Sequence, residues 1–359
     1  MALTTSTGTT DTVTTSTVMT STAWPTDVLD EAQQQSLRSA AADAAGSVER
    51  ALNVAGLAHR TIGLLEQDNA GRFFVGLGAI AAGDVTVARV VEPHLDALGI
   101  LAQAGMPIAD DGDRFGVFAA EAPGDRLVAT PSEDGSWTLT GRKPWCSLAS
   151  ALSHALLTAH TPSGERRLFR VDLRHPGVTA NDHLWLARGM PLVPSGPVDV
   201  ANVPAEPVGD AGWYVDRPGF AWGGIGVAAC WWGGAIGLVD ALQAHAQRKP
   251  DSELALAALG SSAVDIAAAE NAVAEAARAV EAGLVEGRRG AAIAQRVRST
   301  VRGRVDAIRS RTVATLGPAP LTADAPYLAR VADLELYVQQ DHGERDLARL
   351  GRMILDGAL

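Results

Sequence analysis

The sequence is poor in cysteine and in aromatic residues. Its 359 residues include two cysteines, and Phe, Trp and Tyr together make up 5% of the chain. Two cysteines, Cys146 and Cys230, cannot form a disulfide framework or a zinc site built on cysteine. We therefore expect a cytoplasmic protein in a reducing compartment, in which neither thiol needs to be reactive.

Positive charge and long apolar runs are also scarce. Lys and Arg number 30 against 41 Asp and Glu, a formal net charge of -11, which disfavours nucleic acid as a partner. No uninterrupted apolar run reaches the roughly 18 to 20 residues that span a bilayer, so we expect no membrane segment. Residues 1–23 are rich in Thr and Ser and lack the basic and apolar regions of a secretory signal, which predicts a disordered leader.

Several catalytic patterns are missing. The eight histidines follow no HExxH or HxH spacing, so we expect no metal site. No GxSxG segment is present, which removes the simplest hydrolase interpretation. The glycines between residues 223 and 237 continue a helical period instead of following a strand, so we interpret them as contacts for close helix packing. Trp222, Trp231 and Trp232 are then expected in the core.

The residue composition and the spacing of apolar residues change along the chain. Residues 24–114 are rich in Ala and Leu at helical spacing, and Asp84 stands where an N-cap would begin a helix. Residues 115–216 contain short β-rich runs about ten residues apart, which predicts an antiparallel sheet or a small barrel. Residues 217–359 return to long Ala-rich segments. The expected fold class is α+β, with an N-terminal helical domain, a middle antiparallel β domain and a C-terminal four-helix bundle.

Two charged clusters stand out in the C-terminal part. Arginines recur at helical spacing in one segment, and this pattern fits either a solvated stripe paired with acidic neighbours or a surface that faces a subunit or a phosphate. They are Arg296, Arg298, Arg302, Arg304, Arg309 and Arg311. Asp341, His342 and Glu344 lie close together after an amphipathic segment. They are either capping and ion-pairing groups at a helix junction or candidates for a general base.

The segment GRKPWCSLASA, residues 141–151, raises a separate question. It places an indole, a thiol and a hydroxyl side by side at Trp145, Cys146 and Ser147. Taken alone, the segment fits a β-strand whose Trp is packed in the core. It also fits a flat apolar wall with a hydrogen-bonding edge, which is what a flat aromatic cofactor requires.

The order and spacing of several segments resemble the acyl-CoA dehydrogenase superfamily from residue 24 onward. The segments are LGAIAAGDVTVARVVEPHLDALG, GRKPWCSLASALSHALLTA, VDLRHPGV, WLARGMPLVPSGPVDVANVPAEPVG and YVDRPGFAWGGIGVAACWWGGAIGLVDAL. The resemblance implies an acyl-CoA dehydrogenase-like fold and an FAD cofactor between the β domain and the C-terminal bundle. In the family a Trp-x-Ser/Thr segment walls the isoalloxazine ring, and it matches Trp145-Cys146-Ser147, with Cys146 pointing away as packing. Ala119 and Ala120 fall in the family's Thr-Glu-Pro region, where Ala120 replaces the Thr hydroxyl.

The implied reaction needs a base. It removes the α-proton of an acyl thioester while a hydride leaves the β-carbon for flavin N5, so the base and the flavin must lie on opposite sides of the acyl chain. The Tyr-Glu-Gly-Thr segment that carries the base in many members is absent here. Asp341, eight residues after Asp333, occupies the family's interval, and His342 and Glu344 lie beside it. We take Asp341, His342 and Glu344 as the candidate catalytic residues.

The resemblance thus predicts an FAD-dependent oxidoreductase of fatty acid metabolism that acts on CH–CH groups. Its substrate would be a CoA or carrier-protein thioester, and its acceptor an electron-transfer flavoprotein or another oxidant. Family members are homodimers or homotetramers, and Arg248 would reach the cofactor phosphates of a neighbouring subunit. Two alternatives stay open: a flavin enzyme of specialised metabolism, either a carrier-protein dehydrogenase or a monooxygenase, and a non-catalytic paralogue.

Overall fold

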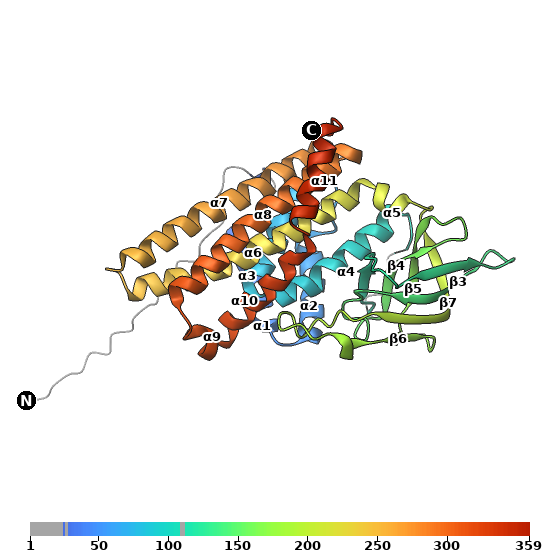
Figure 1. The fold of residues 1–359 in the computed structure, drawn as a ribbon, viewed down its shortest axis with the longest axis horizontal. Coiled ribbons are helices and arrows are strands. Elements are labelled where there is room, and N and C mark those ends of the chain that lie inside the picture. Colours follow the sequence, from blue (N-terminus) through green and yellow to red (C-terminus); the bar gives the residue numbers. More distant parts are fainter. Residues whose placement is uncertain (1–23, 26–27, 108–111) are drawn as a thin grey trace, which may run out of the picture.

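The computed structural model describes residues 24–25, 28–107 and 112–359. The leader expected over residues 1–23 therefore lies outside the described residues. Figure 1 shows the helices as an elongated body, with the strands gathered at one end of it. The α+β fold class is confirmed, because helical segments precede and follow the strands.

The N-terminal helices carry two features that the sequence dictates. They are α1 (Glu31–Ala44), α2 (Val48–Ile62), α3 (Ala70–Gly83) and α4 (Val85–Gln103). The Asp84 carboxylate accepts a hydrogen bond from the Val87 N–H at 2.8 Å, which confirms the predicted N-cap of α4. Pro93 lies inside α4 and has no N–H to donate to the carbonyl of Arg89. The backbone hydrogen bonding of α4 is therefore interrupted at this point.

The strands form a barrel. They are β1 (Phe115–Phe118), β2 (Leu127–Pro131), β3 (Trp137–Lys143), β4 (His154–His160), β5 (Arg166–Asp172), β6 (Val178–Ala180) and β7 (Val198–Val208), with a short 3-10 turn η1 (Asp182–Leu184). Pairing runs in the order β4-β2-β3-β7-β5 and closes through β4–β5, while β1 pairs with β4 and β6 with β7. Closure leaves these five strands without a free edge inside the ring.

The expectation of an antiparallel β domain was wrong in part. β1 runs parallel to β4, with Phe115 opposite His154, and β2 meets β4 in parallel where Val128 lies opposite His160. β1 and β2 therefore follow one another along the same side of β4. The chain between them leaves the barrel as a loop over residues 119–126, which the spacing of β-rich runs cannot predict because that spacing is the same for either strand direction.

The C-terminal part is helical, as expected, but its last helix is divided. The elements are α5 (Trp213–Asp216), α6 (Pro218–Arg248), α7 (Glu253–Glu281), α8 (Gly287–Leu316), α9 (Pro320–Ala323), α10 (Ala325–Tyr337), η2 (Val338–Gln340) and α11 (Glu344–Leu355). The chain turns between η2 and α11 at Asp341, whose buried carboxylate accepts hydrogen bonds from Gln295, Ser299 and Arg302 of α8. The segment expected to be the single fourth helix of the bundle is therefore split into two helices, α10 and α11.

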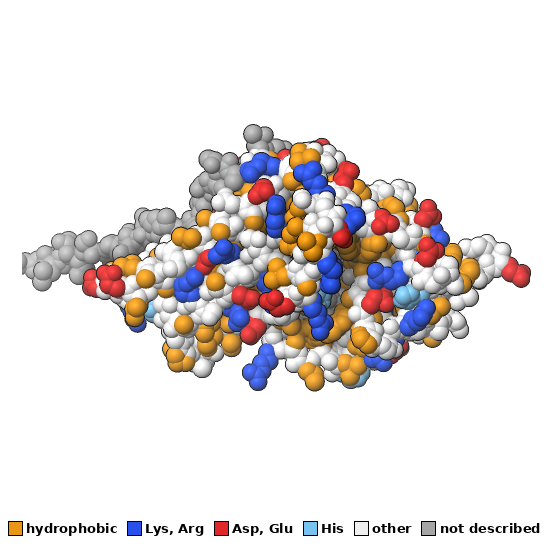
Figure 2. Space-filling model, turned by 45° about the horizontal axis from the view of Figure 1, so that its top comes forward, with side chains coloured by type: hydrophobic (Ala, Val, Ile, Leu, Met, Phe, Trp, Pro, Cys, Tyr) orange, Lys and Arg blue, Asp and Glu red, His pale blue; other side chains and the backbone are white. Residues whose placement is uncertain are grey.

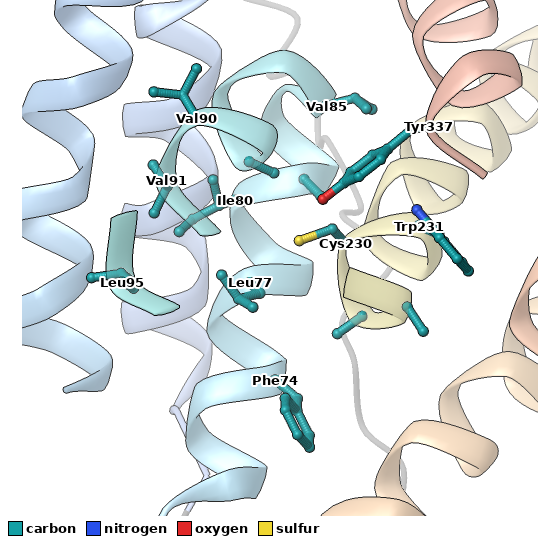
Figure 3. Close-up of a cluster of buried hydrophobic side chains, with 14 of the residues drawn as sticks. Phe74, Leu77, Ile80, Val85, Val90, Val91, Leu95, Cys230, Trp231 and Tyr337 are labelled. Atoms are coloured by element: carbon teal, nitrogen blue, oxygen red, sulfur yellow. The ribbon is translucent and has the colours of Figure 1, made fainter. Parts of the chain in front are cut away.

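The glycines of α6 allow its backbone to touch α3. A Cβ atom added at Gly233 would lie 2.0 Å from the carbonyl oxygen of Gly78, a distance that no side chain tolerates. Trp231 and Trp232 are fully buried on other faces of α6, and Trp222 is 7% exposed. Figure 3 shows Cys230 of α6 pointing toward the cluster that Phe74 and Leu77 of α3 help to form, whereas Trp231 points to the other side of α6. The interpretation as packing residues is confirmed for Gly233, Gly234 and Gly237, but not for Gly223 and Gly224, where an added Cβ atom would meet other atoms no closer than 3.4 Å.

Helix α6 is the one described helix that is long and apolar enough to cross a membrane, judged by length and composition. The search for uninterrupted apolar runs did not anticipate this, because glycines divide the apolar residues of α6. However, 78% of its most apolar window is buried inside the protein. A helix that is apolar on all sides and covered by other helices is typical of a central core element.

We predict that the Gly233→Ala substitution destabilises the protein, because the added methyl group collides with the backbone of α3. The expected loss is about 2–3 kcal/mol of unfolding free energy, measured by urea denaturation. The matched control is Gly303→Ala in α8, where a Cβ atom meets nothing within 4 Å. That variant is expected to gain about 0.5–1 kcal/mol, as Ala does over Gly in a helix. Equal stability of the two variants would contradict the role given to Gly233.

Candidate functional site

A cavity of about 900 Å³ lies between the barrel, α4, the first half of α6, α8 and the α10–α11 junction. Its walls are mainly apolar, and aromatic side chains gather there although the sequence contains few of them. Two of the chain's three tyrosines are included. The aromatic lining residues are Trp145, Trp185, Tyr214, Phe220 and Tyr337. A large apolar cavity with a few converging polar groups is the arrangement expected of a ligand site.

The segment that contains Trp145 forms a loop between β3 and β4, not a strand. Trp145 and Leu148 have positive φ angles of 58° and 61°, a conformation that bulky residues rarely adopt. The loop is fixed by hydrogen bonds from Cys146 N–H to the Gly196 carbonyl and from Leu148 N–H to the Pro194 carbonyl. The Trp145 indole is 56% exposed, lines the cavity and meets Trp185 edge to face at 6.5 Å. The strained loop therefore presents a flat apolar side chain to the cavity.

Ser147 connects this wall to helix α4. Its hydroxyl lies 2.8 Å from the Ser195 hydroxyl and accepts a hydrogen bond of 3.1 Å from Nη2 of Arg89. The Arg89 guanidinium also lies 5.7 Å from the ring centre of Tyr337 and 3.6 Å, through Nη1, from Oε2 of Glu92. Arg89 thus contacts both the barrel side and the helical side of the cavity.

Glu92 is a buried carboxylate in the cavity wall. It is 8% exposed and follows Arg89 by one helical turn on α4. Burial raises its pKa from 4.5 to about 7, although the nearby guanidinium groups of Arg89 and Arg298 oppose this shift and Asp96 adds to it. A carboxyl group with a pKa near neutrality can take up or release a proton under ordinary conditions.

Two further arginines line the cavity, Arg217 buried and Arg298 half-buried. Arg217 donates to Gln103 Oε1 at 2.8 Å and to Asp96 Oδ1 at 3.4 Å, so the pair joins α4 to the start of α6. Burial raises the pKa of Asp96, and Arg217 limits the rise. Arg298 of α8 donates to the carbonyls of Gly224 and Gln340. These contacts tie the walls of the cavity to one another.

The candidate catalytic residues occupy three different environments. Asp341 is fully buried, does not line the cavity, and accepts four hydrogen bonds, the fourth from the Gly343 N–H. His342 lines the cavity, with its side chain 65% exposed and 3.4 Å from Asp346 Oδ2. Glu344 is exposed at the start of α11 and is not among the lining residues. The catalytic role of these residues stays a prediction, and the geometry of Asp341 is that of a structural anion.

The residues predicted to bind the cofactor also occupy different environments. Ala119 and Ala120 lie in the loop after β1 and line the cavity. Cys146 is fully buried and points away, with its thiol 3.3 Å from the Lys143 carbonyl, and burial raises its pKa to about 12. Arg248 is exposed at the far end of α6, roughly 36 Å along the helix from Gly224 at 1.5 Å per residue. Arg248 therefore lies outside the cavity of its own chain.

The sequence contained a signal for Arg89, Glu92 and Asp96 that the sequence analysis did not use. These residues recur at intervals of three and four in an otherwise apolar helical run, VTVARVVEPHLDALG. Charged residues at that spacing share one face of a helix, and in an apolar helix that face must meet a partner or a cavity. Arg217 and Ser195 carry no comparable local signal.

Most of the arginine stripe is paired with acidic groups, as its simpler interpretation predicted. Arg296 lies 3.2 Å from Glu275, Arg304 3.2 Å from Asp265, and Arg309 3.2 Å from Glu335. On the face shown in Figure 2, basic and acidic side chains are mixed instead of forming one large patch. Arg298 is the exception, because it turns inward and lines the cavity.

No protein-family model and no curated protein matches the sequence. Solved structures match it over most of its length. KijD3 in complex with FMN and dTDP-3-amino-2,3,6-trideoxy-4-keto-3-methyl-D-glucose aligns with a TM-score of 0.75 and 20% identity, over 91% of this chain and 92% of that chain. FMN-bound TdsC from Paenibacillus sp. A11-2 aligns with a TM-score of 0.74 and 17% identity, over 90% and 96%.

A third structure, the methanesulfinate monooxygenase MsuC from Pseudomonas fluorescens, aligns with a TM-score of 0.74 and 17% identity, over 92% of this chain and 97% of that chain. At such identities the similarity establishes the fold and nothing finer. The acyl-CoA dehydrogenase-like fold that the sequence resemblance implied is confirmed.

The geometry of Asp341 gives a prediction about stability. Replacing Asp341 by Asn removes a buried charge that Arg302 and three other donors surround, so we expect a loss of about 2–4 kcal/mol of unfolding free energy. The matched control is Glu344→Gln on exposed α11, expected to change stability by less than about 0.5 kcal/mol. Urea denaturation measures both. An unchanged stability of Asp341→Asn together with lost activity would instead favour a catalytic role.

Proposed function

We propose that this chain, of acyl-CoA dehydrogenase-like fold, is a flavin-dependent monooxygenase that binds FMN, an oxidoreductase acting on a small planar substrate. The observation that carries the proposal is the exposed Trp145 indole, held in a strained loop beside Ser147 on the wall of a 900 Å³ cavity. A flat apolar face beside a hydroxyl is what an isoalloxazine ring requires.

The residues present fit a flavin. Trp145 would cover one side of the ring system, and the small side chains of Ala119 and Ala120 leave room beside it. The Ser147 hydroxyl, oriented by Ser195 and Arg89, would hydrogen-bond the polar edge of the ring. Reduced FMN would supply two electrons to O2, so that one oxygen atom enters the substrate, the other leaves as water and the flavin is re-oxidised. The cavity walls would keep bulk water from the reacting groups.

The similar structures support FMN in place of the FAD expected from the sequence. KijD3 and TdsC were both solved with FMN bound. In this chain Arg248, the residue expected at the distal phosphates of FAD, lies outside the cavity. An adenine dinucleotide would need Arg248 from a second copy of the chain, and we keep a homodimer or homotetramer as part of the proposal.

Acyl thioester dehydrogenation has less support. Among the similar structures, MsuC is a methanesulfinate monooxygenase and TdsC a dibenzothiophene monooxygenase. Asp341, at the position where the sequence comparison expected the base, is closed off by donors from α8. The loss of the Thr hydroxyl at Ala120 removes a further polar contact that dehydrogenases use. The proposed monooxygenase would receive its electrons from a separate NAD(P)H-dependent flavin reductase.

We predict that the purified full-length protein binds FMN more tightly than FAD, measured by quenching of flavin fluorescence. Removing the indole in Trp145→Ala should weaken FMN binding about fivefold to tenfold, the value of an aromatic contact. Ser147→Ala should weaken it by a similar factor, because one hydrogen bond is lost. The control is Ser132→Ala, an exposed position at the β2–β3 turn, which should bind FMN as the wild type does.

The reaction type is tested separately. With bound flavin under anaerobic conditions, NADH and a flavin reductase should bleach the absorbance near 450 nm, whereas acyl-CoA thioesters should not. Bleaching by an acyl-CoA alone would restore the dehydrogenase interpretation. Absence of any flavin binding would instead leave the non-catalytic paralogue as the explanation.

A further inference from the structure

The Glu92 carboxylate lies in the cavity wall without a hydrogen-bond donor. Among the described residues it accepts no hydrogen bond from a side chain or a backbone N–H, and its ion pair with Arg89 is 3.6 Å long. That separation is too great for a hydrogen bond. A carboxylate can accept about four hydrogen bonds, and a buried one that accepts none is unfavourable. The Glu92 oxygens are not among the fully enclosed side-chain atoms that lack a partner, so they are open to the cavity, and a donor there can reach them.

The charged and titratable groups around Glu92 come from several elements. Arg89 and Asp96 share α4 with it, Arg298 approaches from α8, and Cys230, Tyr337 and Tyr214 approach from α6, α10 and α5. Arg217 pairs with Asp96, and His342 with Asp346 at the α10–α11 junction. Asp96 is thus already paired with a guanidinium group, and the positive charges of Arg89 and Arg298 both act on Glu92. A substrate that brought a further positive charge to Glu92 would be repelled by these two arginines.

The shape of this side of the cavity favours a flat ligand. Tyr214 and Phe220 meet edge to face at 5.3 Å and both line the cavity. The apolar side chains of Val117 and Val227 line the same cavity. Aromatic rings pack best against other aromatic rings, stacked or edge to face.

We propose that the cavity takes a planar, uncharged substrate, and that Glu92 recognises it by accepting a hydrogen bond from an N–H or O–H group on its ring. Glu92 is then a specificity-determining residue. The inference deepens the proposed function and rests on it for the reaction, but not for the binding step. Because a charge-assisted hydrogen bond is roughly twice as strong as a neutral one, the preference for a donor ligand depends on the charge of Glu92.

The expected pH dependence follows from that charge. The pKa of Glu92 is raised to about 7 by burial, so the carboxylate is mainly ionised at pH 8 and mainly protonated at pH 6. A ligand with an N–H group gains more from the ionised form, and an isostere without a donor leaves that form unsatisfied. Selectivity for the donor should therefore rise as pH increases through 7.

The experiment compares two neutral isosteres, indole and benzothiophene, which differ by an N–H group in place of sulfur. Indole is a bound ligand in a structure of TdsC. Their dissociation constants are measured by calorimetry on the full chain, with and without bound FMN, at pH 6 and pH 8. We expect indole to bind about fivefold to tenfold more tightly than benzothiophene at pH 8, and less than threefold more tightly at pH 6.

The Glu92→Leu variant should bind both probes equally at either pH. Glu92→Gln keeps a carbonyl acceptor, so it should retain a small preference for indole that no longer changes with pH. The control is Glu133→Gln at the exposed β2–β3 turn, which should behave as the wild type. Every variant is checked for folding by circular dichroism, and the preserved shape in Glu92→Gln keeps the test valid if Glu92→Leu is unstable.

Three results would overturn the inference. One is an indole to benzothiophene ratio near one at both pH values, and another is a pH dependence that persists in Glu92→Gln. The third is failure of both probes to bind. The measurement uses no oxygen, reductase or turnover, so loss of the flavin function would leave the ratio unchanged. Conversely, normal FMN binding together with an indole to benzothiophene ratio near one would reject the role of Glu92 and leave the proposed flavin function in place.

Discussion

The backbone contact between α3 and α6 is the constraint on which the other packing depends. Gly233 touches the Gly78 carbonyl, so α6 lies deep enough to pack against α3, α4, α7, α8 and α10 at once. With α6 in that position, Trp231 and Trp232 are enclosed without forcing neighbouring helices apart. The first turns of the same helix then form one wall of the cavity. A residue with any side chain at Gly233 would displace both the core and that wall.

The cavity depends on contacts that join separate elements. Arg89 bridges the Trp145 loop and α4 through Ser147 and Glu92, and Asp333 of α10 accepts hydrogen bonds from the Thr86 hydroxyl on α4 and from the Met190 N–H. The barrel wall and the helical wall are therefore held at a fixed separation. Preorganisation of this kind lowers the entropy that ligand binding would otherwise cost.

Structural features set by neighbouring residues were predictable from the sequence, whereas features set by contacts between distant residues were not. The cap at Asp84 and the packing role of Gly233, Gly234 and Gly237 follow from residue type and spacing, and both were confirmed. The parallel pairing of β1 with β4 depends on the path of the loop between strands, which no local pattern records. Counting residues to Asp341 gave a candidate base, but three of the four donors to this side chain come from α8, about forty residues earlier in the chain. Glu92 was missed although Arg89, Glu92 and Asp96 share one face of α4 at helical spacing, because that pattern does not record that the face meets a cavity.

Because the sequence contains few aromatic residues, the placement of Trp145 on the cavity wall is informative. Trp145 is kept in a left-handed conformation that costs about 1–3 kcal/mol for a non-glycine residue, and more than half of its surface is exposed. Burial cannot offset that cost, because Trp145 is not in the core, and its edge contact with Trp185 contributes at most about 1.5 kcal/mol. The backbone hydrogen bonds of Cys146 and Leu148 hold the loop in spite of the strain. The strained loop thus keeps an exposed, flat, apolar side chain on the cavity wall, and we propose that a flat ligand uses that face.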